Sequence, residues 1–235
     1  MTAREELRGQ LHAGADALRM ALAPRQSDRL LDYVALLAKW NAVYNLTAVR
    51  DPRRMVAAHL LDCLAALPDA IALGAGQGAR ILDVGSGAGL PGIVWAIMLD
   101  GADRPPATFV LIDAVEKKTA FQRQACAELG LHNVQCVHAR VERWQGAPFD
   151  LVCSRAYASL SDFVDGTRHL LAGTGRWLAM KGEPPAGELA RLPGHTAVER
   201  VVPLAVPMLD DASRCVVVLR PATQAPDATD AHDAR

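Results

Sequence analysis

The sequence lacks the features that mark several protein classes. Its five cysteines are odd in number and include no C-x-x-C pair, which argues against a disulfide scaffold and a zinc site. Aromatic residues make up only 5% of the 235 residues, and the net charge is −1. Without an excess of one charge, the chain is neither a disordered polyion nor a strongly basic nucleic-acid coat. Binding to RNA would require its basic residues to gather on one face.

Long uninterrupted hydrophobic runs are also missing. The most apolar region, 56–74, contains His59, Asp62, Pro68 and Asp69, so we expect no single helix across a bilayer. The first ten residues are charged and precede no apolar stretch that resembles a signal peptide. We therefore expect a cytoplasmic protein, a monomer, with no membrane partner and no bound metal.

Hydrophobic residues, at 51%, are numerous enough to bury one large core. In the first part of the chain they recur at three- and four-residue intervals, which predicts helices. One helix should begin with Ser27 as its N-cap and end where the segment 41–47 breaks the period. Another should begin with Asp51 as N-cap and Pro52 in its first turn, and Pro68 should stop it.

From Arg80 onward, short apolar runs alternate with amphipathic stretches. This alternation predicts an α/β fold, with a mostly parallel sheet and helices on both faces. We predict a helical N-terminal region (1–75), a Rossmann-like domain (76–220) and a disordered tail (221–235). The proline-containing stretch 99–108 should form a surface excursion. The expected strands cover 81–84, 109–112, 134–137, 151–153, 177–180 and 215–219.

The most specific motif is ILDVGSGAGLPG at 81–92, a glycine-rich loop between an expected strand and an expected helix. Glycine lets a chain turn tightly and lets a ligand approach the backbone closely. Counted from Gly87, the motif fits the dinucleotide fingerprint G-x-G-x-x-G. Counted from the strand end at Gly85, it is instead G-x-G-x-G, and the last fingerprint position falls on Leu90. The register therefore argues against a dinucleotide loop, although a loop that merely turns is the alternative interpretation.

Two acidic residues accompany this loop. Asp83 precedes it and could hold the loop amides or a ligand amine. Asp113 ends the second expected strand, where a carboxylate can accept the ribose hydroxyls of a nucleoside. Asp113 could equally cap the helix that follows. Together the loop and Asp113 indicate an adenosine-containing ligand, without separating nicotinamide from S-adenosylmethionine.

Four blocks, in this order and spacing, resemble the RsmG (GidB) family of ribosomal RNA methyltransferases. They are WNAVYNLT (40–47), DVGSGAGLPG (83–92), the Asp113 strand end followed by EKK (116–118) and Phe121, and SRA (154–156) followed by MKG (180–182). The resemblance spans residues 30–219. It implies a class I methyltransferase fold with a seven-stranded sheet, S-adenosylmethionine as methyl donor, and methylation of guanosine N7 in 16S RNA or the small ribosomal subunit.

The resemblance also implies roles for individual residues. Gly85 and Leu90 would contact the methionine and ribose parts of the cofactor, and Val141 and Glu142 would border the adenine. Arg155 would lie over the donor site, although an arginine after a strand is often only a solvated end. With Asp83, Gly87 and Asp113 from the loop argument, the predicted cofactor-binding residues are Asp83, Gly85, Gly87, Leu90, Asp113, Val141, Glu142 and Arg155.

Basic residues suited to RNA phosphates lie in three segments. Arg50, Arg53 and Arg54 flank the second helix start and could form a rim with neighbouring Asn41, Asn45 and Thr47. Each group could also be an ordinary solvated surface or, for Lys181, part of a turn. We predict that they gather around the cofactor site. The predicted RNA-binding residues are Arg50, Arg53, Arg54, Lys117, Lys118 and Lys181.

Methylation at guanine N7 needs no general base, because N7 has a free lone pair and no proton. We therefore assign no catalytic residue, and we expect His59 to be a satisfied core histidine. Two other functions stay open: a methyltransferase with another substrate, and a nicotinamide-dependent oxidoreductase on a similar fold. A binding module without turnover is a third.

Overall fold

The computed structural model describes residues 2–222 except for 77, 102–105, 158 and 210–212. Most of the predicted tail and the middle of the predicted excursion at 99–108 lie outside the described residues. The helical elements are α1 (Ala3–Ala17), α2 (Pro24–Tyr44), α3 (Pro52–Met55), η1 (Val56–Leu61), α4 (Asp62–Ala72), α5 (Gly92–Leu99), α6 (Glu116–Leu129), η2 (Val141–Arg143), α7 (Leu160–Thr167), η3 (Arg168–Leu170) and α8 (Ala186–Leu189). The strands are β1 (Arg80–Val84), β2 (Thr108–Asp113), β3 (Val134–His138), β4 (Phe149–Arg155), β5 (Leu171–Lys181), β6 (Thr196–Pro203) and β7 (Cys215–Pro221).

These strands form one seven-stranded sheet with the order β3-β2-β1-β4-β5-β7-β6. The pairs from β3 through β5 are parallel, and β7 runs antiparallel to both β5 and β6. The predicted α/β class with a mostly parallel sheet is confirmed. Chain order reverses between β1 and β4, and ligands of open α/β sheets bind beyond the carboxyl ends of the strands at such a switch point.

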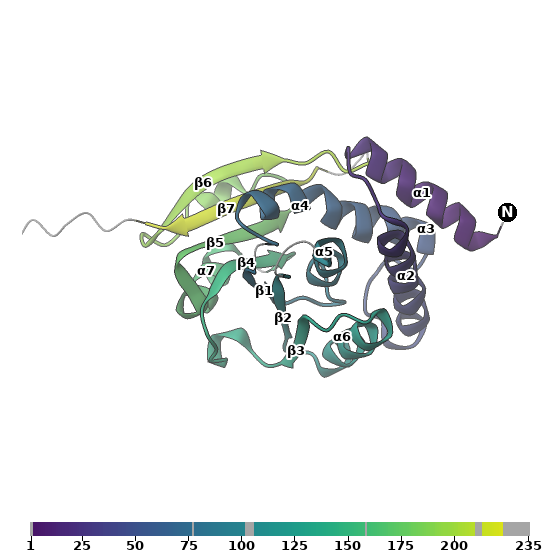
Figure 1. Cartoon of the computed structure of the whole chain (residues 1–235). Coiled ribbons are helices and arrows are strands. Elements are labelled where there is room, and N and C mark those ends of the chain that lie inside the picture. Colours follow the sequence, from purple (N-terminus) through teal and green to yellow (C-terminus); the bar gives the residue numbers. More distant parts are fainter. Residues whose placement is uncertain (1, 77, 102–105, 158, 210–212, 223–235) are drawn as a thin grey trace, which may run out of the picture.

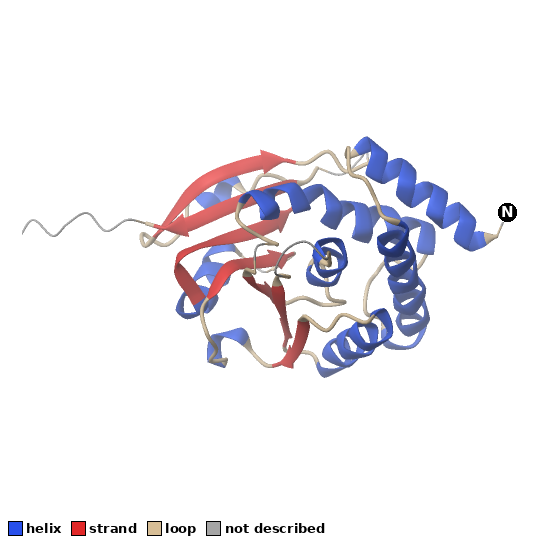
Figure 2. Cartoon of the chain, in the orientation of Figure 1, coloured by secondary structure: helices blue, strands red, loops and turns tan. Residues whose placement is uncertain are grey.

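Alternate residues of each strand pack against different helical layers. Ile81 and Leu111 belong to the cluster that includes α2, α4, α5 and α6, whereas Leu82 and Ile112 belong to the cluster that includes α7. Figures 1 and 2 show the same division, with α4, α5 and α6 on one side of the sheet and α7 on the other. Both faces are therefore covered, which is why the central strands read as nearly continuous apolar runs.

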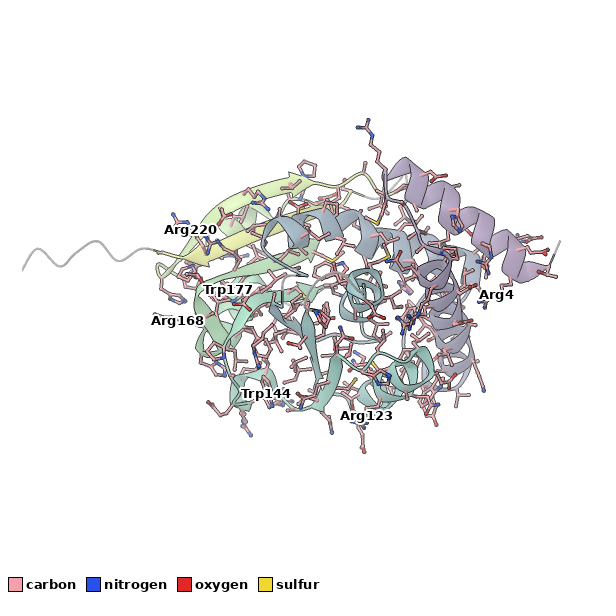
Figure 3. The ribbon with its side chains drawn as sticks, viewed as in Figure 1. Arg4, Arg123, Trp144, Arg168, Trp177 and Arg220 are labelled. Carbon is pink, nitrogen blue, oxygen red and sulfur yellow. The ribbon has the colours of Figure 1, made fainter. Side chains whose placement is uncertain are left out.

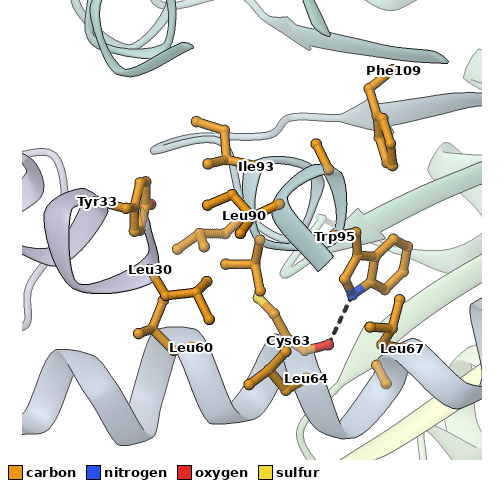
Figure 4. Packing of buried hydrophobic residues seen from close by; sticks show 14 of the residues in the cluster. Leu30, Tyr33, Leu60, Cys63, Leu64, Leu67, Leu90, Ile93, Trp95 and Phe109 are labelled. Atoms are coloured by element: carbon orange, nitrogen blue, oxygen red, sulfur yellow. Dashed lines mark hydrogen bonds between the residues drawn. The ribbon is translucent and has the colours of Figure 1, made fainter. Parts of the chain in front are cut away.

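The N-terminal helices share their core with the sheet. Leu30, Leu60 and Leu64 pack in one cluster with Ile93 of α5, and the Trp95 indole donates a 2.8 Å hydrogen bond to the Cys63 carbonyl (Figure 4). This packing fixes α2 and α4 against the helix that follows the glycine loop. The domain boundary near residue 75 stays a prediction, since both sides of it contribute to one core.

Several predicted element boundaries are wrong. Ser27 is not an N-cap, because α2 begins at Pro24, where the fixed φ of proline suits a first turn. Pro68 lies inside α4 rather than ending it. Proline removes only one helical hydrogen bond, and buried residues on both sides of it, Leu64 and Ala70, hold the helix in the core. The Asp51 cap is confirmed: its carboxylate accepts from the Arg53 amide at 2.9 Å.

The elements that were not predicted include α1 and β6. Helix α1 begins with a capping box formed by Thr2 and Glu5. Strand β6 is an edge strand with mixed exposure, so it lacks the apolar run that marked the others. Helix α2 also continues to Tyr44, into the segment expected to break it.

The segment from Pro52 to Ala72 is one continuous helical rod through α3, η1 and α4. By length and composition alone it could cross a membrane, but 72% of its most apolar window is buried inside the protein. It is thus a core helix.

Exposed charged side chains such as Arg4, Arg123 and Arg168 lie at the outside of the molecule (Figure 3).

Candidate functional site

The glycine loop joins β1 to α5 in a conformation that only glycine adopts easily. Gly85, Gly87 and Gly89 have φ angles of +62°, +60° and +84°. A Cβ on Gly85 would lie 3.2 Å from the Tyr157 ring, whereas one on Gly87 would have only the Gly85 carbonyl oxygen within 4 Å, at 3.9 Å. The backbone at Gly87 therefore faces open space, as a loop that cradles a ligand requires.

Side chains from three elements hold the loop in place. The Gly87 amide donates to Asp113 Oδ2 at 2.9 Å, and Gln122 Nε2 of α6 donates to the Gly87 carbonyl at 2.8 Å. The Tyr33 hydroxyl of α2 donates to the Ala88 carbonyl at 2.8 Å. The contributions of Gln122 and Tyr33 were missed, because both residues lie far from the loop in the sequence and belong to none of its motifs.

Asp83 is fully buried behind the loop. Its Oδ2 accepts from the Gly92 amide at 2.8 Å, at the start of α5, while Oδ1 has no partner among the described residues. Burial raises the pKa of Asp83 to about 7, against the opposing effects of the Gly92 amide and Arg155. The carboxylate thus holds a loop amide, one of its two predicted roles, and the ligand-amine role stays a prediction.

The raised pKa of Asp83 predicts a pH-dependent stability. Between pH 4 and pH 7 the folded protein holds the Asp83 proton more tightly than the unfolded chain does, so the free energy of unfolding falls as pH rises through this window. The full effect is at most about 4 kcal/mol. Asp83→Asn keeps an oxygen for the Gly92 amide and cannot titrate.

Urea unfolding at pH 5 and pH 8 checks this prediction. The stability of wild type relative to Asp83→Asn should be lower at pH 8 than at pH 5. Asp150→Asn is the control, since Asp150 also accepts a backbone amide, that of Arg80, at 2.8 Å at the opposite end of the strands. If the difference in unfolding free energy between wild type and Asp83→Asn does not change with pH, the prediction is contradicted.

A cavity of about 610 Å³ opens beyond the ends of β1 and β4. It is lined by loop residues, by the ends of β4 and β5, by the start of β7 and by the segment before α3. Asp62, Tyr157 and Arg214 line it in addition to the expected residues, and so does Thr47 of the expected rim. Of the predicted site residues, it brings together Gly85, Gly87, Leu90, Lys118, Arg155 and Lys181.

A second cavity of about 280 Å³ adjoins the first on the side of β2 and β3. It is lined by Asp113, Val141 and Glu142, and it shares Gly85, Lys118, Ala156 and Tyr157 with the larger cavity. The Tyr157 hydroxyl donates to Glu142 Oε1 at 3.3 Å. The two cavities together therefore bring all the predicted cofactor-binding residues except the buried Asp83 to one continuous surface.

Asp113 uses both carboxylate oxygens for backbone amides. Oδ2 accepts from Gly87, and Oδ1 accepts from Val115 at 2.9 Å, just before α6. Lys118 Nζ lies 3.7 Å from Oδ2. The carboxylate therefore anchors the loop and the turn that leads into α6. It is not the N-cap of that helix, because the N-cap is Val115, which receives no side-chain cap hydrogen bond. Each oxygen keeps a lone pair for the predicted ribose contact.

We expect Asp113→Ala to weaken cofactor binding by about 1–3 kcal/mol, because it removes a loop anchor and a hydroxyl acceptor. Calorimetric titration with S-adenosylmethionine measures the change. Asp150→Ala is the matched control, because it loses one carboxylate–amide bond at the other end of the sheet. Loss of folding stability in Asp113→Ala with unchanged affinity would leave Asp113 only as an anchor of the loop and of the turn before α6.

Arg155 ends β4 and lies against the helical rod. Its Nη1 donates to the Ala58 carbonyl at 3.0 Å and to Asp62 Oδ2 at 3.1 Å. Ala58 belongs to η1, a π-helical turn, and such rare turns often occur at functional sites. Arg155 is therefore a partly buried, cavity-lining cation rather than a solvated strand end.

The π-helical turn also carries His59, which is buried. Its Nε2 lies 3.0 Å from Thr47 Oγ1 and its Nδ1 lies 2.9 Å from the Ala58 carbonyl oxygen. Burial, aided by Arg155, lowers the pKa of His59 to about 4, so the ring is neutral at pH 7. His59 is a satisfied core histidine, as predicted, and it supports the cavity-lining segment at Thr47.

The remaining predicted basic residues are divided. Lys181 lines the cavity and pairs with Glu188 at 2.9 Å. Arg53 pairs with Glu6 of α1, and Arg50 Nη2 donates to Asn45 Oδ1 at 3.2 Å. Two of the six thus line the larger cavity, Lys118 and Lys181; the four that do not are Arg50, Arg53, Arg54 and Lys117, all exposed.

Asp62 and Arg214 were not predicted as site residues. Asp62 Oδ1 accepts from Arg214 Nε at 3.0 Å, while Oδ2 accepts from Arg155. In the sequence Asp62 interrupts an apolar run, and a carboxylate at such a position is the signal that it has a buried cationic partner. Nothing in the sequence near Arg214 connects it to residues 62 and 155, because they meet only through folding.

Comparison with known proteins gives consistent results. The family model described as GidB, rRNA small subunit methyltransferase G, matches residues 26–217. A protein of Acidovorax sp. (strain JS42) named "Ribosomal RNA small subunit methyltransferase G" is 50% identical over 222 residues, covering 90% of this chain and 94% of that protein. A protein of Burkholderia thailandensis with the same name is 52% identical, with coverages of 89% and 90%.

Solved structures show the same fold at low sequence identity. Magnesium protoporphyrin IX methyltransferase from Synechocystis PCC 6803, crystallised with bound SAM, has a TM-score of 0.56 and 16% identity, covering 85% of this chain and 98% of that one. TrmN from Thermus thermophilus has a TM-score of 0.56 and 20% identity, with coverages of 71% and 53%. These likenesses place the fold in the class I methyltransferases, as predicted.

Proposed function

The chain belongs to the ribosomal RNA small subunit methyltransferase G family, and from this membership we propose that it methylates N7 of a guanosine in 16S ribosomal RNA. It is an S-adenosylmethionine-dependent rRNA methyltransferase, so the nicotinamide alternative is set aside. We further propose that it acts in the cytoplasm as a monomer, on free RNA or on the small subunit.

The residues present fit S-adenosylmethionine. The backbone at Gly87 borders open space beside the larger cavity, and Gly85, whose nearest neighbour on that side is the Tyr157 ring, lines both cavities. Asp113, Val141 and Glu142 line the adjoining smaller cavity, where a nucleoside would lie. We propose that the loop glycines and Leu90 hold the methionine end and that the smaller cavity holds the adenosine end. When bound, the cofactor supplies an electrophilic methyl group on a sulfonium.

The observation that carries the proposal is the position of the larger cavity. It adjoins the glycine loop and Arg155 at the β1–β4 switch point, and it carries the cations Lys181 and Arg214 toward β5 and β7. A donor and an anionic substrate can therefore meet within one cavity. Three of its apolar lining residues are mostly shielded from solvent, which helps to exclude water: Leu46, Leu90 and Met180.

For this reaction the protein mainly has to align the methyl donor with guanine N7. Guanine N7 attacks with its own lone pair, and no proton must leave, so none of the cavity residues has to act as a base. Positioning two reactants can supply on the order of 7–11 kcal/mol of barrier reduction. We propose that Arg155, fixed by Asp62 and the Ala58 carbonyl, orders the donor side of the cavity.

Incubation with methyl-labelled S-adenosylmethionine tests the function. The substrates are small subunits lacking the modification, free 16S RNA, and 23S RNA as a control. We expect label on one guanosine of 16S RNA, at N7, mapped by aniline-induced chain cleavage. Label at another position, or on neither 16S substrate, would contradict the proposal. Binding of S-adenosylmethionine without transfer to any RNA would indicate a binding module.

RNA affinity should depend on salt although the net charge is only −1. Each phosphate contact removed should reduce the slope of log affinity against log salt by about 0.7–0.9. Filter binding measures this slope for Lys118→Gln, which alters a cavity-lining lysine, and for Lys117→Gln, which alters an exposed one. An unchanged slope in both variants would remove these lysines from the RNA-binding surface.

A further inference from the structure

Asp62, Arg155 and Arg214 form a triad between the helical rod and the sheet. Asp62 at the start of α4 is only 3% exposed, and its two oxygens are divided between the two arginines, at 3.1 Å and 3.0 Å. All three residues line the larger cavity. One buried carboxylate therefore holds two cations at the wall of the proposed active site.

The triad has two positive side chains, Arg155 and Arg214, and one negative side chain, Asp62. Lys118 has Asp113 nearby at 3.7 Å, and Lys181 pairs with Glu188 at 2.9 Å. Each lysine thus has a carboxylate of its own, whereas Arg155 and Arg214 share Asp62. The excess positive charge of the cavity lies at the two arginines, and an anion is the group that would complete it.

Arg214 is held with part of its guanidinium uncommitted. Nε donates to Asp62, and Nη1 donates to the Ser213 carbonyl at 2.8 Å, so two contacts fix the guanidinium plane. Within the described part of the chain, Nη2 has no hydrogen-bond partner. A planar guanidinium fixed in this way is suited to a phosphate oxygen.

The sheet order separates Arg214 from the cofactor. The proposed adenosine site extends from β1 toward β2 and β3, whereas Arg214 precedes β7 on the opposite side. Strand β7 is three strand spacings from β1, which is about 14 Å. Arg155 on β4 is adjacent to β1 and therefore closer to the donor.

We propose that Arg214, oriented by Asp62, binds a phosphate of the substrate RNA beside the methylated guanosine. This inference rests on the proposed function and adds to it one RNA-binding residue, Arg214, and one positioning residue, Asp62. Asp62 is itself negatively charged, and yet in this role it supports the binding of an anion, because it holds the Arg214 cation in place.

The variant Asp62→Asn tests this role, because charge neutralisation and loss of positioning change RNA affinity in opposite directions. If Asp62 only offset positive charge, its neutralisation would strengthen RNA binding. If it positions Arg214, the same change weakens RNA binding, although the protein becomes more positive. We expect about tenfold weaker RNA affinity, the size of one charge-assisted hydrogen bond.

The companion variants are Arg214→Gln, Arg214→Lys and the control Arg200→Gln. Arg200 lies on neighbouring β6 and is also ion-paired, with Asp69 at 3.3 Å, but it does not line the cavity. We expect Arg214→Gln to lower 16S RNA affinity about tenfold and the salt slope by about 0.7–0.9, with unchanged S-adenosylmethionine affinity. Arg214→Lys should keep the slope and lose affinity, and Arg200→Gln should change neither.

Filter binding at four salt concentrations and calorimetry with S-adenosylmethionine decide the outcome, with melting curves to verify folding. Weaker cofactor binding by Arg214→Gln at an unchanged salt slope would assign the arginine to the cofactor carboxylate and overturn the inference. Stronger RNA binding by Asp62→Asn would overturn the positioning role. If Arg214→Gln does not fold, full RNA affinity in Arg214→Lys would overturn the role of the planar guanidinium. Wild-type protein that methylates no 16S RNA would instead contradict the proposed function.

Discussion

Gly85→Val is expected to abolish binding of S-adenosylmethionine while leaving the chain folded. Gly85 has a φ of +62°, where a side chain costs about 1–2 kcal/mol of backbone strain. It lines both the larger and the smaller cavity, so branched methyl groups would enter the space proposed for the cofactor. The Tyr157 ring, 3.2 Å from a new Cβ, would also have to shift.

Calorimetry and melting curves measure the two effects separately. Gly173→Val is the matched control, because a Cβ on Gly173 has nothing within 4 Å and the residue lies in β5 before its cavity end. The control should bind S-adenosylmethionine as wild type does. Unchanged affinity in Gly85→Val would show that the cofactor site lies elsewhere.

Arg155→Ala is expected to lower methyl transfer to 16S RNA by about 100-fold, or about 3 kcal/mol, the cost of removing a buried charge contact. The loss of stability should be smaller, because Asp62 keeps its hydrogen bond to Arg214. Arg155→Lys should restore only part of the activity, since one ammonium cannot reproduce the planar fork that contacts Ala58 and Asp62.

Single-turnover methylation and melting temperatures test this expectation. Arg176→Ala is the control: Arg176 also lies on a central strand and pairs with a carboxylate, Glu199, but it is absent from the cavity lining. Near-normal transfer by Arg155→Ala would mean that Arg155 only fastens the helical rod to β4.

Strands were predicted better than helix ends. The six apolar runs all lie within strands, because strands covered on both faces are nearly continuous in hydrophobicity. Helix ends depended on particular contacts and conformations. Buried neighbours carry α4 through Pro68. Helix α2 ends after Tyr44, where Asn45 adopts a left-handed conformation and the Asn41 side chain bonds the Thr47 amide and the Val49 carbonyl beyond it.

By itself, the sequence determined the fold class, the glycine loop and the family, because these depend on local periodicity and on residues adjacent in the chain. Alternating glycines at a strand end need no distant partner to be interpreted. The tertiary structure alone decided how the loop is held, by Tyr33 and Gln122, and what surrounds Arg155. Residues 62, 155 and 214 are far apart in the chain, and only the order of β1, β4, β5 and β7 brings them to one cavity. A charge network of this kind has no sequence period, so it becomes visible only when the sheet is assembled.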